Sequence, residues 1–177
     1  MNTYILLLRG INVGGNCSLP MKELVAILDA LGYENIQTYI QSGNVVLRHK
    51  GKLNKKDADA VGKAILKKKG FEPRILLIDK KELLSAIKSN PFDTSIGKAL
   101  HFFFLDSEPI KPNIKLIESV KAKTENYKLA KQVFYLHAPD GVGKSKLAVT
   151  VEKALGIPVT ARNWNTVAKL VEMIEGN

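Results

Sequence analysis

The sequence has a single cysteine, three histidines and no long apolar run. Cys17 has no second cysteine to pair with, which excludes an internal disulfide framework. No apolar segment approaches the roughly 20 residues that a membrane-spanning helix needs. The N-terminal stretch MNTYILLLRG lacks a basic leader and a cleavage site, so we expect a strand there and not a signal peptide. These absences together predict a cytoplasmic protein without a membrane segment.

Side chains typical of catalysis or metal binding are equally sparse. The three histidines, His49, His101 and His137, show no metal-ligand spacing with one another or with Cys17. No combination of serine, histidine and aspartate that resembles a catalytic triad can be identified. The sequence therefore predicts no metal site and no cofactor, and it favours a non-enzymatic protein. An enzyme whose nucleophile or base the sequence does not reveal is the other interpretation.

Arginine is also rare, although the chain carries a net charge of +10. Of the 27 basic residues, 23 are lysines and only four are arginines: Arg9, Arg48, Arg74 and Arg162. Lysine is a hydrated point charge, whereas arginine is the usual reader of bases and phosphates through paired hydrogen bonds. The excess of lysine favours a solvated basic surface over a nucleic-acid interface, which we keep as the alternative.

The first half of the chain has the pattern of strand, helix, two strands, helix and strand. Strands are predicted at 3–10, 35–41, 44–49 and 72–79, with a hairpin at Ser42-Gly43 between the middle two. A helix over 19–31 places Leu24, Ile27, Leu28 and Leu31 on one face, and a helix over 55–69 points Val61, Ile65 and Leu66 inward.

The same order returns in the second half. Strands are expected at 99–106, 126–130, 132–137 and 158–162, helices at 112–122 and 143–155, and an additional helix at 163–175. A short helix around 80–87 and a turn cluster at 89–93 separate the two halves. The repeated order suggests an internal duplication at the level of the fold.

These patterns predict an α+β protein made of a tandem pair of ferredoxin-like βαββαβ units with antiparallel sheets, plus a C-terminal helix. The predicted domains are a first unit at 1–79, a connecting segment at 80–97 and a second unit at 98–177. In each unit, strands one and two run parallel and strand three returns between them. The loop after strand one and the hairpin between strands two and three are therefore expected at the same end of the sheet.

The stretch HAPDGVGKSKL, residues 137–147, matches a relaxed phosphate-loop pattern with Ala138 in place of the first glycine. Such a loop joins a strand to a helix within a parallel sheet, but the surrounding pattern predicts antiparallel strands. Only 32 residues follow Ser145, and Pro139 removes one backbone N–H from the loop. We therefore consider a phosphate-loop NTPase unlikely and predict a helix start near Lys144.

Five ordered motifs resemble a known family: LLRGINVGGN at 7–16, a Met and Leu pair at 21 and 24, TYIQSGN at 38–44, YLHAPDGVGKSKL at 135–147 and TARNWNTVAKL at 160–170. The chain is similar to the bacterial domain-of-unknown-function family 1697. The resemblance covers nearly the whole chain and implies two ferredoxin-like α+β halves. It implies no established activity.

Two clusters are candidate binding sites. The first combines the glycine-rich loop after the first strand with the hairpin, where backbone amides and an arginine suit a small anion or a nucleotide-like ligand. The alternative is a purely structural turn. Its residues are Arg9, Gly10, Asn12, Gly14, Gly15, Asn16, Gln41, Ser42 and Asn44.

The second cluster joins the start of the helix at 143–155 to the motif ARNWN. It would hold an anion or a base at a helix N-terminus beside an arginine and the only tryptophan. The structural alternative is that Asn163 or Asn165 caps the last helix and that Trp164 packs in the core. Its residues are Gly141, Gly143, Lys144, Ser145, Lys146, Arg162, Asn163 and Trp164.

Overall fold

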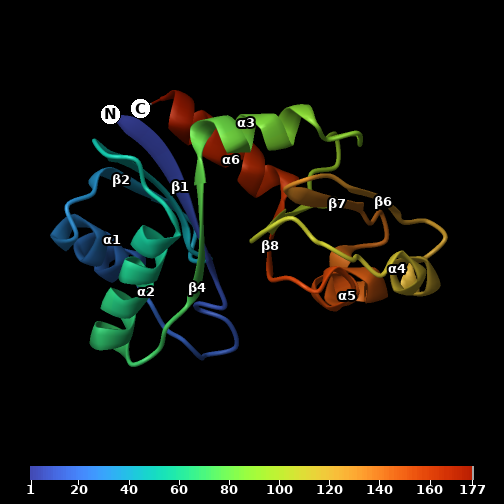
Figure 1. The fold of residues 1–177 in the computed structure, drawn as a ribbon, viewed down its shortest axis with the longest axis horizontal. Coiled ribbons are helices and arrows are strands. Elements are labelled where there is room, and N and C mark those ends of the chain that lie inside the picture. The colour runs from blue at the N-terminus through green and yellow to red at the C-terminus, as the bar shows by residue number, and fades with distance from the viewer. Residues whose placement is uncertain (177) are drawn as a thin grey trace. The chain divides into compact units, whose positions relative to one another are not determined.

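The computed structural model describes residues 1–176, which form two compact α+β units (Figure 1). Met1–Leu84 and residues 169–176 make up the first unit, and Ser85–Ala168 make up the second. The predicted ranges differ, since they ended the first half at Asp79 and gave the whole C-terminal helix to the second half. Four of the residues at 169–176 line a groove together with a strand of the first unit.

The helices and strands follow the predicted order. In the first unit they are β1 (Asn2–Arg9), α1 (Met21–Ala30), β2 (Glu34–Tyr39), β3 (Asn44–His49), α2 (Lys55–Lys69) and β4 (Arg74–Asp79). In the second unit they are β5 (Leu100–Leu105), α4 (Ile114–Val120), β6 (Asn126–Leu129), β7 (Val133–His137), the 3₁₀ turn η1 (Val142–Lys144), α5 (Lys146–Leu155) and β8 (Val159–Asn163). The helices α3 (Lys80–Lys88) and α6 (Trp164–Glu175) contribute residues to both units.

Each unit contains a four-stranded antiparallel sheet. The strand order is β2-β3-β1-β4 in the first sheet and β6-β7-β5-β8 in the second. Every neighbouring pair is antiparallel, so β3 runs back between the parallel strands β1 and β2, and β7 does the same between β5 and β6. The predicted fold class is thereby confirmed.

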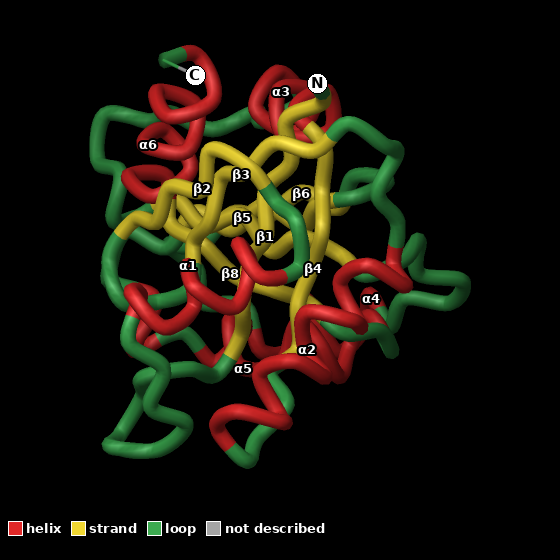
Figure 2. The backbone as a smooth tube through the Cα atoms, turned by 90° about the vertical axis from the view of Figure 1, so that its left-hand side faces the viewer, coloured by secondary structure: helices red, strands yellow, loops and turns green. Residues whose placement is uncertain are grey.

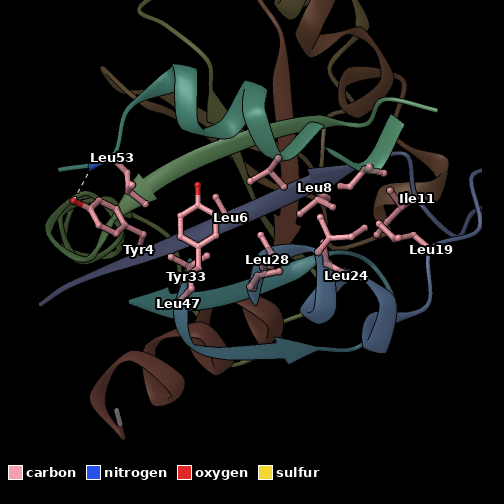
Figure 3. Packing of buried hydrophobic residues seen from close by; sticks show 14 residues of the cluster. Tyr4, Leu6, Leu8, Ile11, Leu19, Leu24, Leu28, Tyr33, Leu47 and Leu53 are labelled. Atoms are coloured by element: carbon pink, nitrogen blue, oxygen red, sulfur yellow. Dashed lines mark hydrogen bonds between the residues drawn. The ribbon is translucent and has the colours of Figure 1, made fainter. Parts of the chain in front are cut away.

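In the first unit, α1 and α2 cover one face of the sheet (Figure 2). The buried leucines and isoleucines of both helices pack on alternate residues of the strands, including Leu6 and Leu8 of β1 and Leu47 of β3 (Figure 3). The hydroxyl of Tyr4 accepts a hydrogen bond from the backbone N–H of Leu53 (3.1 Å). This bond fixes the chain between β3 and α2 at the edge of the core.

The ends of both helices lie close to their predicted positions, but two leucines do not face the core as predicted. Asn54 caps α2 and forms a capping box with Asp57, while Gly70 ends the helix in the left-handed conformation. The inward position predicted for Leu31 and Leu66 is wrong, because their side chains are 40% and 42% exposed. Leu31 follows the last residue of α1, and Leu66 lies one helical step beyond the buried Ile65, so neither faces the sheet.

The core of the second unit lies between its sheet and the helices α4 and α5. Phe103 and Phe134 pack edge to face in this core (ring centroids 6.0 Å apart). Tyr135 points to the opposite face of the sheet, where its hydroxyl donates to the backbone oxygen of Ala86 (2.6 Å). Because the aromatic side chains of β5 and β7 are buried, they form a core and not a stacking platform for nucleic-acid bases. No helix within residues 1–176 combines the length and the apolarity needed to cross a membrane.

Gly43 provides a test of the packing at the hairpin. Its φ is +76°, and a Cβ there would lie 2.5 Å from the Cβ of Leu8 and 2.9 Å from Cδ1 of Ile11. We expect Gly43→Ala to lower the free energy of unfolding by about 2–4 kcal/mol, combining the left-handed backbone with steric overlap. Urea denaturation of the purified protein measures this change.

Gly70→Ala is the matched control for this substitution. Gly70 has φ +79°, but a Cβ there would meet no atom within 4 Å. Its replacement should cost only the backbone term, about 1–2 kcal/mol. Equal losses of stability in the two variants would contradict the close packing of Gly43 on Leu8.

Candidate functional site

The glycine-rich loop after β1 contains a tight reverse turn at Val13–Asn16. The backbone N–H of Asn16 donates to the oxygen of Val13 (3.0 Å), and that of Asn12 donates to the oxygen of Cys17 (3.1 Å). Gly14 and Gly15 occupy the centre of this turn with φ +59° and +77°, and a side chain there would meet nothing within 4 Å. These glycines are therefore needed for the backbone angles of the turn, and they leave its tip exposed.

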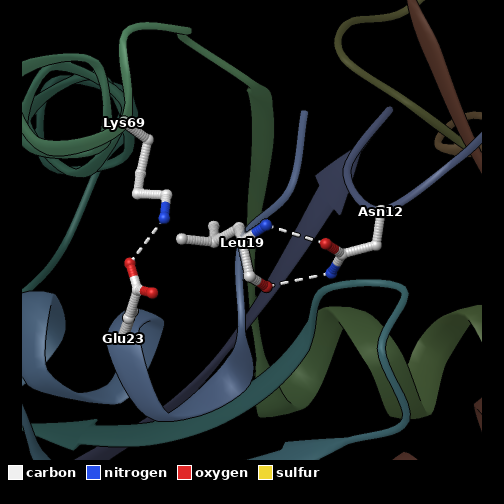
Figure 4. A network of polar contacts seen from close by, with 4 residues as sticks. All are labelled: Asn12, Leu19, Glu23 and Lys69. Carbon is white, nitrogen blue, oxygen red and sulfur yellow. Dashed lines mark hydrogen bonds and ion pairs between the residues drawn. The ribbon is translucent and has the colours of Figure 1, made fainter. Parts of the chain in front are cut away.

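The side chain of Asn12 holds the loop together. Its Oδ1 accepts from the backbone N–H of Leu19 (2.7 Å), and its Nδ2 donates to the backbone oxygen of Leu19 (2.9 Å) (Figure 4). The same Nδ2 also donates to the backbone oxygen of Gln41 (2.8 Å). Both amide hydrogens are thus used within the protein, which gives Asn12 a structural role. The bond to Gln41 also shows that the loop and the hairpin between β2 and β3 meet at the same end of the sheet, as the strand order predicts.

The hairpin is closed from inside by Asn44. Its Nδ2 donates to the backbone oxygen of Tyr39 (3.1 Å) and to the hydroxyl of Ser42 (2.9 Å), and its side chain is fully buried. The backbone oxygen of Gly43 accepts from the N–H of Leu8 (2.8 Å) and joins the hairpin to β1. Asn44 therefore shapes the hairpin and is not accessible to a ligand in solution.

Left-handed backbone is concentrated in these two segments. Twelve described residues have positive φ, and seven of them lie here: Gly10, Asn12, Gly14, Gly15, Cys17, Ile40 and Gly43. Ile40 is the most unusual, because a β-branched residue rarely adopts φ +49°. Its side chain is 51% exposed, so burial in the core does not explain the strain. Strained backbone of this kind is found most often at binding and catalytic sites.

The remaining predicted residues of the first cluster are exposed around these segments. Arg9 ends β1 next to Leu8, whose N–H is bonded to the hairpin. Its side chain is on the sheet face opposite α1 and α2, because Leu6 and Leu8 alternate with it and face the helices. Asn16 and Gln41 are exposed as well. The structure thus brings together the loop, the hairpin and the end of β1, as the sequence predicts.

In the second cluster, the loop before α5 is occupied by its own hydrogen bonds. The backbone N–H groups of Gly141, Lys144 and Ser145 donate to oxygens three residues earlier, and the hydroxyl of Ser145 accepts from Ala148 N–H (2.9 Å). Ser145 is therefore the N-cap of α5. Since β7 is antiparallel to both of its neighbours, the loop also lacks the parallel sheet of a phosphate-loop domain.

The motif ARNWN lies at the same end of the second sheet as the loop before α5, but its side chains do not all point to one face of the sheet. Arg162 is opposite Phe102 in the strand register, on the face away from α4 and α5. Burial lowers the pKa of its guanidinium to about 10, and its Nη1 donates to the oxygen of Ala161. Trp164 stacks on Phe102 (5.8 Å), and Asn163 Oδ1 accepts from Thr166 N–H, which confirms the structural role predicted for Asn163 as the cap of α6.

One buried histidine, His101, lies in the same region, and the sequence alone indicates no particular role for it. His101 is opposite Asn163 on β8 and Leu136 on β7, and only 8% of its surface is exposed. Burial lowers the pKa of its imidazole, and the carbonyl of Ala99 offsets this only partly. The neutral form is therefore favoured in the folded protein.

An open groove of about 470 Å³ lies elsewhere in the first unit. Residues of the edge strand β2 form one wall, and one face of α6 forms the other together with the residue after the helix. The lining residues are Gln37, Thr38, Tyr39, Lys169, Glu172, Met173 and Gly176. Lys169 and Glu172 are ion-paired across one helical turn (2.7 Å). None of the predicted site residues lines this groove. Over residues 1–176, no three histidine, cysteine, aspartate or glutamate side chains converge as a set of metal ligands.

Comparison with known proteins identifies the family. The family model described as "Protein of unknown function (DUF1697)" matches residues 1–135, so the chain belongs to this family. The match includes the whole first cluster and the start of the second half. No curated protein matches the chain.

A solved structure shows the same fold. It is described as the structure of the conserved bacterial protein SP0830 from Streptococcus pneumoniae, and it is 24% identical to this chain. The alignment covers 98% of each chain with a TM-score of 0.70. The similarity extends the shared architecture beyond residue 135, to the second unit and the C-terminal helix.

Ser145 gives a direct test of the loop before α5. We expect Ser145→Ala to destabilise the protein by about 0.5–2 kcal/mol, because α5 loses its N-cap, while Ser145→Thr should keep most of the stability. Chemical denaturation measures both variants. Lys144→Ala should be close to neutral, because Lys144 is exposed. An Ala variant as stable as wild type would show that the cap contributes nothing.

His101 predicts a dependence of stability on pH. Its folded pKa lies below the unfolded value of about 6.5, so the unfolded chain binds the proton first as the pH falls. The contribution of His101 is complete above pH 6.5 and is lost below it, by no more than about 1.4 kcal/mol per pH unit. Denaturation curves at several pH values should show a weaker dependence for His101→Leu. His49→Gln, in the first unit, is the control and should keep the part of the pH dependence of stability that His101 provides.

Proposed function

We propose that this protein is a non-enzymatic module that binds a small anionic or nucleotide-like ligand at the end of its first sheet. The site consists of the loop at 10–19, the hairpin at 40–43 and the end of β1. The observation that carries this proposal is the concentration of left-handed backbone, at Asn12, Cys17 and Ile40 besides the glycines, in two segments that Asn12 joins. A fold without a function at this end would not need an exposed Ile40 in the left-handed region.

The exposed groups at this end of the sheet include several hydrogen-bond donors. Arg9 supplies an exposed guanidinium, the turn at Gly14 and Gly15 supplies exposed backbone, and Asn16 and Gln41 supply amides. Donors of this kind suit phosphate, carboxylate or the edge of a nucleobase. Asn12, Ser42 and Asn44 hold the two segments in place by the hydrogen bonds described above. The support thus consists of a positioned scaffold and a set of exposed donors around it.

Nucleic-acid binding is the second candidate, and the observation that favours it is the basic surface of α2. This helix carries six of the 23 lysines, at positions 55, 56, 63, 67, 68 and 69. The buried aromatics of the second sheet argue against base stacking. A salt series distinguishes the candidates, because affinity that depends on many phosphate contacts falls steeply with salt and binding of a single small anion does not.

Replacement of Arg9 tests the first candidate. If Arg9 donates to the ligand, Arg9→Ala should weaken binding by about 1.5–3 kcal/mol, the range for hydrogen bonds to charged groups. A panel of phosphates, nucleotides and dicarboxylates is screened by thermal shift, and binding to any stabilising member is then measured by calorimetry. Lys68→Ala, at the exposed end of α2, is the control and should bind nearly as wild type does.

A structural role for Arg9 gives a different result. The melting temperature of Arg9→Ala would then fall, while the affinity of the folded fraction for the ligand stayed the same. The proposal would also be contradicted if no member of the panel stabilised the wild-type protein.

A further inference from the structure

Three exposed apolar residues lie at one end of the first unit, on three separate segments. Val13 begins the tight turn of the loop at 10–19, Ile40 is in the hairpin at 40–43, and Leu66 is in the last turn of α2. They are 67%, 51% and 42% exposed. Scattered apolar residues on a surface need no explanation, whereas a group of them marks a place of interaction with a protein or a membrane.

Polar contacts hold these three segments at the same end. Asn12 joins the loop to the hairpin through the backbone oxygen of Gln41 (2.8 Å). Lys69, the last residue of α2, donates to Oε2 of Glu23 in the first turn of α1 (2.7 Å) (Figure 4). Because α1 begins two residues after the loop, the last turn of α2 lies beside the base of the loop.

The same end carries exposed basic side chains. Lys22 is in the first turn of α1, Lys67 is in the last turn of α2, and Arg74 begins β4 beside the end of β1. Within residues 1–176, no acidic side chain forms an ion pair with any of these three. The helix dipole accounts for a cation at the end of α2, but it disfavours one in the first turn of α1. Stabilisation of the helices therefore does not explain this set of charges.

We propose that this end of the first unit docks on an anionic lipid bilayer, with Val13, Ile40 and Leu66 entering the interface and the basic side chains facing the headgroups. Apolar side chains gain free energy on leaving water, and the surface potential of an anionic leaflet attracts each nearby lysine or arginine. Nucleic acid would satisfy the charges, but aliphatic side chains do not stack on bases as aromatic ones do. The contact is peripheral, and it does not depend on the small ligand of the proposed function.

Ile40 separates docking from folding. Its φ of +49° is unfavourable for a β-branched residue, whereas asparagine adopts this region readily. Ile40→Asn should therefore raise the melting temperature of the protein and at the same time weaken its binding to the bilayer. A purely structural role for Ile40 does not produce these opposite changes.

Co-sedimentation of the full chain with lipid vesicles tests this inference. Wild type should bind vesicles of phosphatidylcholine mixed with phosphatidylserine, and should bind vesicles of phosphatidylcholine alone much more weakly. Val13→Ser and Ile40→Asn should each weaken binding about threefold to tenfold, the loss of roughly half the transfer free energy of a fully buried side chain. Lys22→Ala and Lys67→Ala should each weaken it about fivefold, the contribution of one basic residue near an anionic surface.

Matched controls carry the same changes elsewhere. Ile110→Asn and Val149→Ser replace exposed residues of the second unit and should bind as wild type does. Lys56→Ala replaces an exposed lysine in the first turn of α2. It lies roughly 16 Å from Lys67 along the helix, beyond the Debye length of about 8 Å at physiological salt, so its effect should be smaller than that of Lys67→Ala.

Three results would overturn the docking surface. Wild type that sediments with neither kind of vesicle excludes it. Lysine variants that lose binding while Val13→Ser and Ile40→Asn keep it show attraction by charge alone, as a nucleic-acid surface would give. Calorimetric binding of soluble glycerophosphoserine as tight as that of the vesicles identifies a headgroup pocket and not a bilayer contact. Because the proposed function is tested with soluble phosphates, nucleotides and dicarboxylates, its outcome is independent of these results.

Discussion

Three hydrogen bonds from one carboxamide determine the geometry of the candidate site. Asn12 holds both backbone groups of Leu19 and one oxygen of the hairpin, at Gln41. Leu19 is fully buried beneath the loop, two residues before α1 begins. The same side chain therefore closes the loop, positions the start of α1 and joins the loop to the hairpin. A shorter or apolar residue at position 12 would leave the backbone of Leu19 without these partners, at a cost of about 1–3 kcal/mol for each buried group.

The rest of the site follows from this constraint. The loop at 10–19 reverses over four residues, from Val13 to Asn16, and this tight turn uses left-handed backbone at Gly14 and Gly15. The hairpin must meet the loop closely, and Gly43 is the residue that permits contact with Leu8 and Ile11. The absence of a Cβ in glycine explains the backbone angles and the close contacts at these positions. It does not explain Ile40, where a branched side chain remains in an exposed and strained turn.

Much of this arrangement is predictable from sequence, because it depends on local patterns. Apolar periodicity predicts the strands and helices, and the βαββαβ order then brings the loop and the hairpin to one end of the sheet. Apolar periodicity wrongly predicts that Leu66 is buried, because the sequence does not indicate where the buried face of a helix ends and its exposed face begins. The pairing of Arg9 with Arg74 depends on the register between strands far apart in the chain, which alternation alone does not determine. The hydrogen bonds of Asn12 are likewise properties of the folded loop.

The positions of the arginines connect the fold to the proposed chemistry. Arg9, Arg48 and Arg74 lie on the face of the first sheet opposite α1 and α2, as their alternation with the core residues shows. Arg162 lies on the corresponding face of the second sheet, opposite α4 and α5. Lysines, by contrast, are concentrated on the exposed helices and loops, with six on α2 alone, although Lys128 lies on β6 opposite Tyr135. All four arginines are on sheet strands, whereas nearly all the lysines are not. This distribution is expected if most lysines serve solvation, while arginine supplies a planar fork of donors at the surface of a sheet.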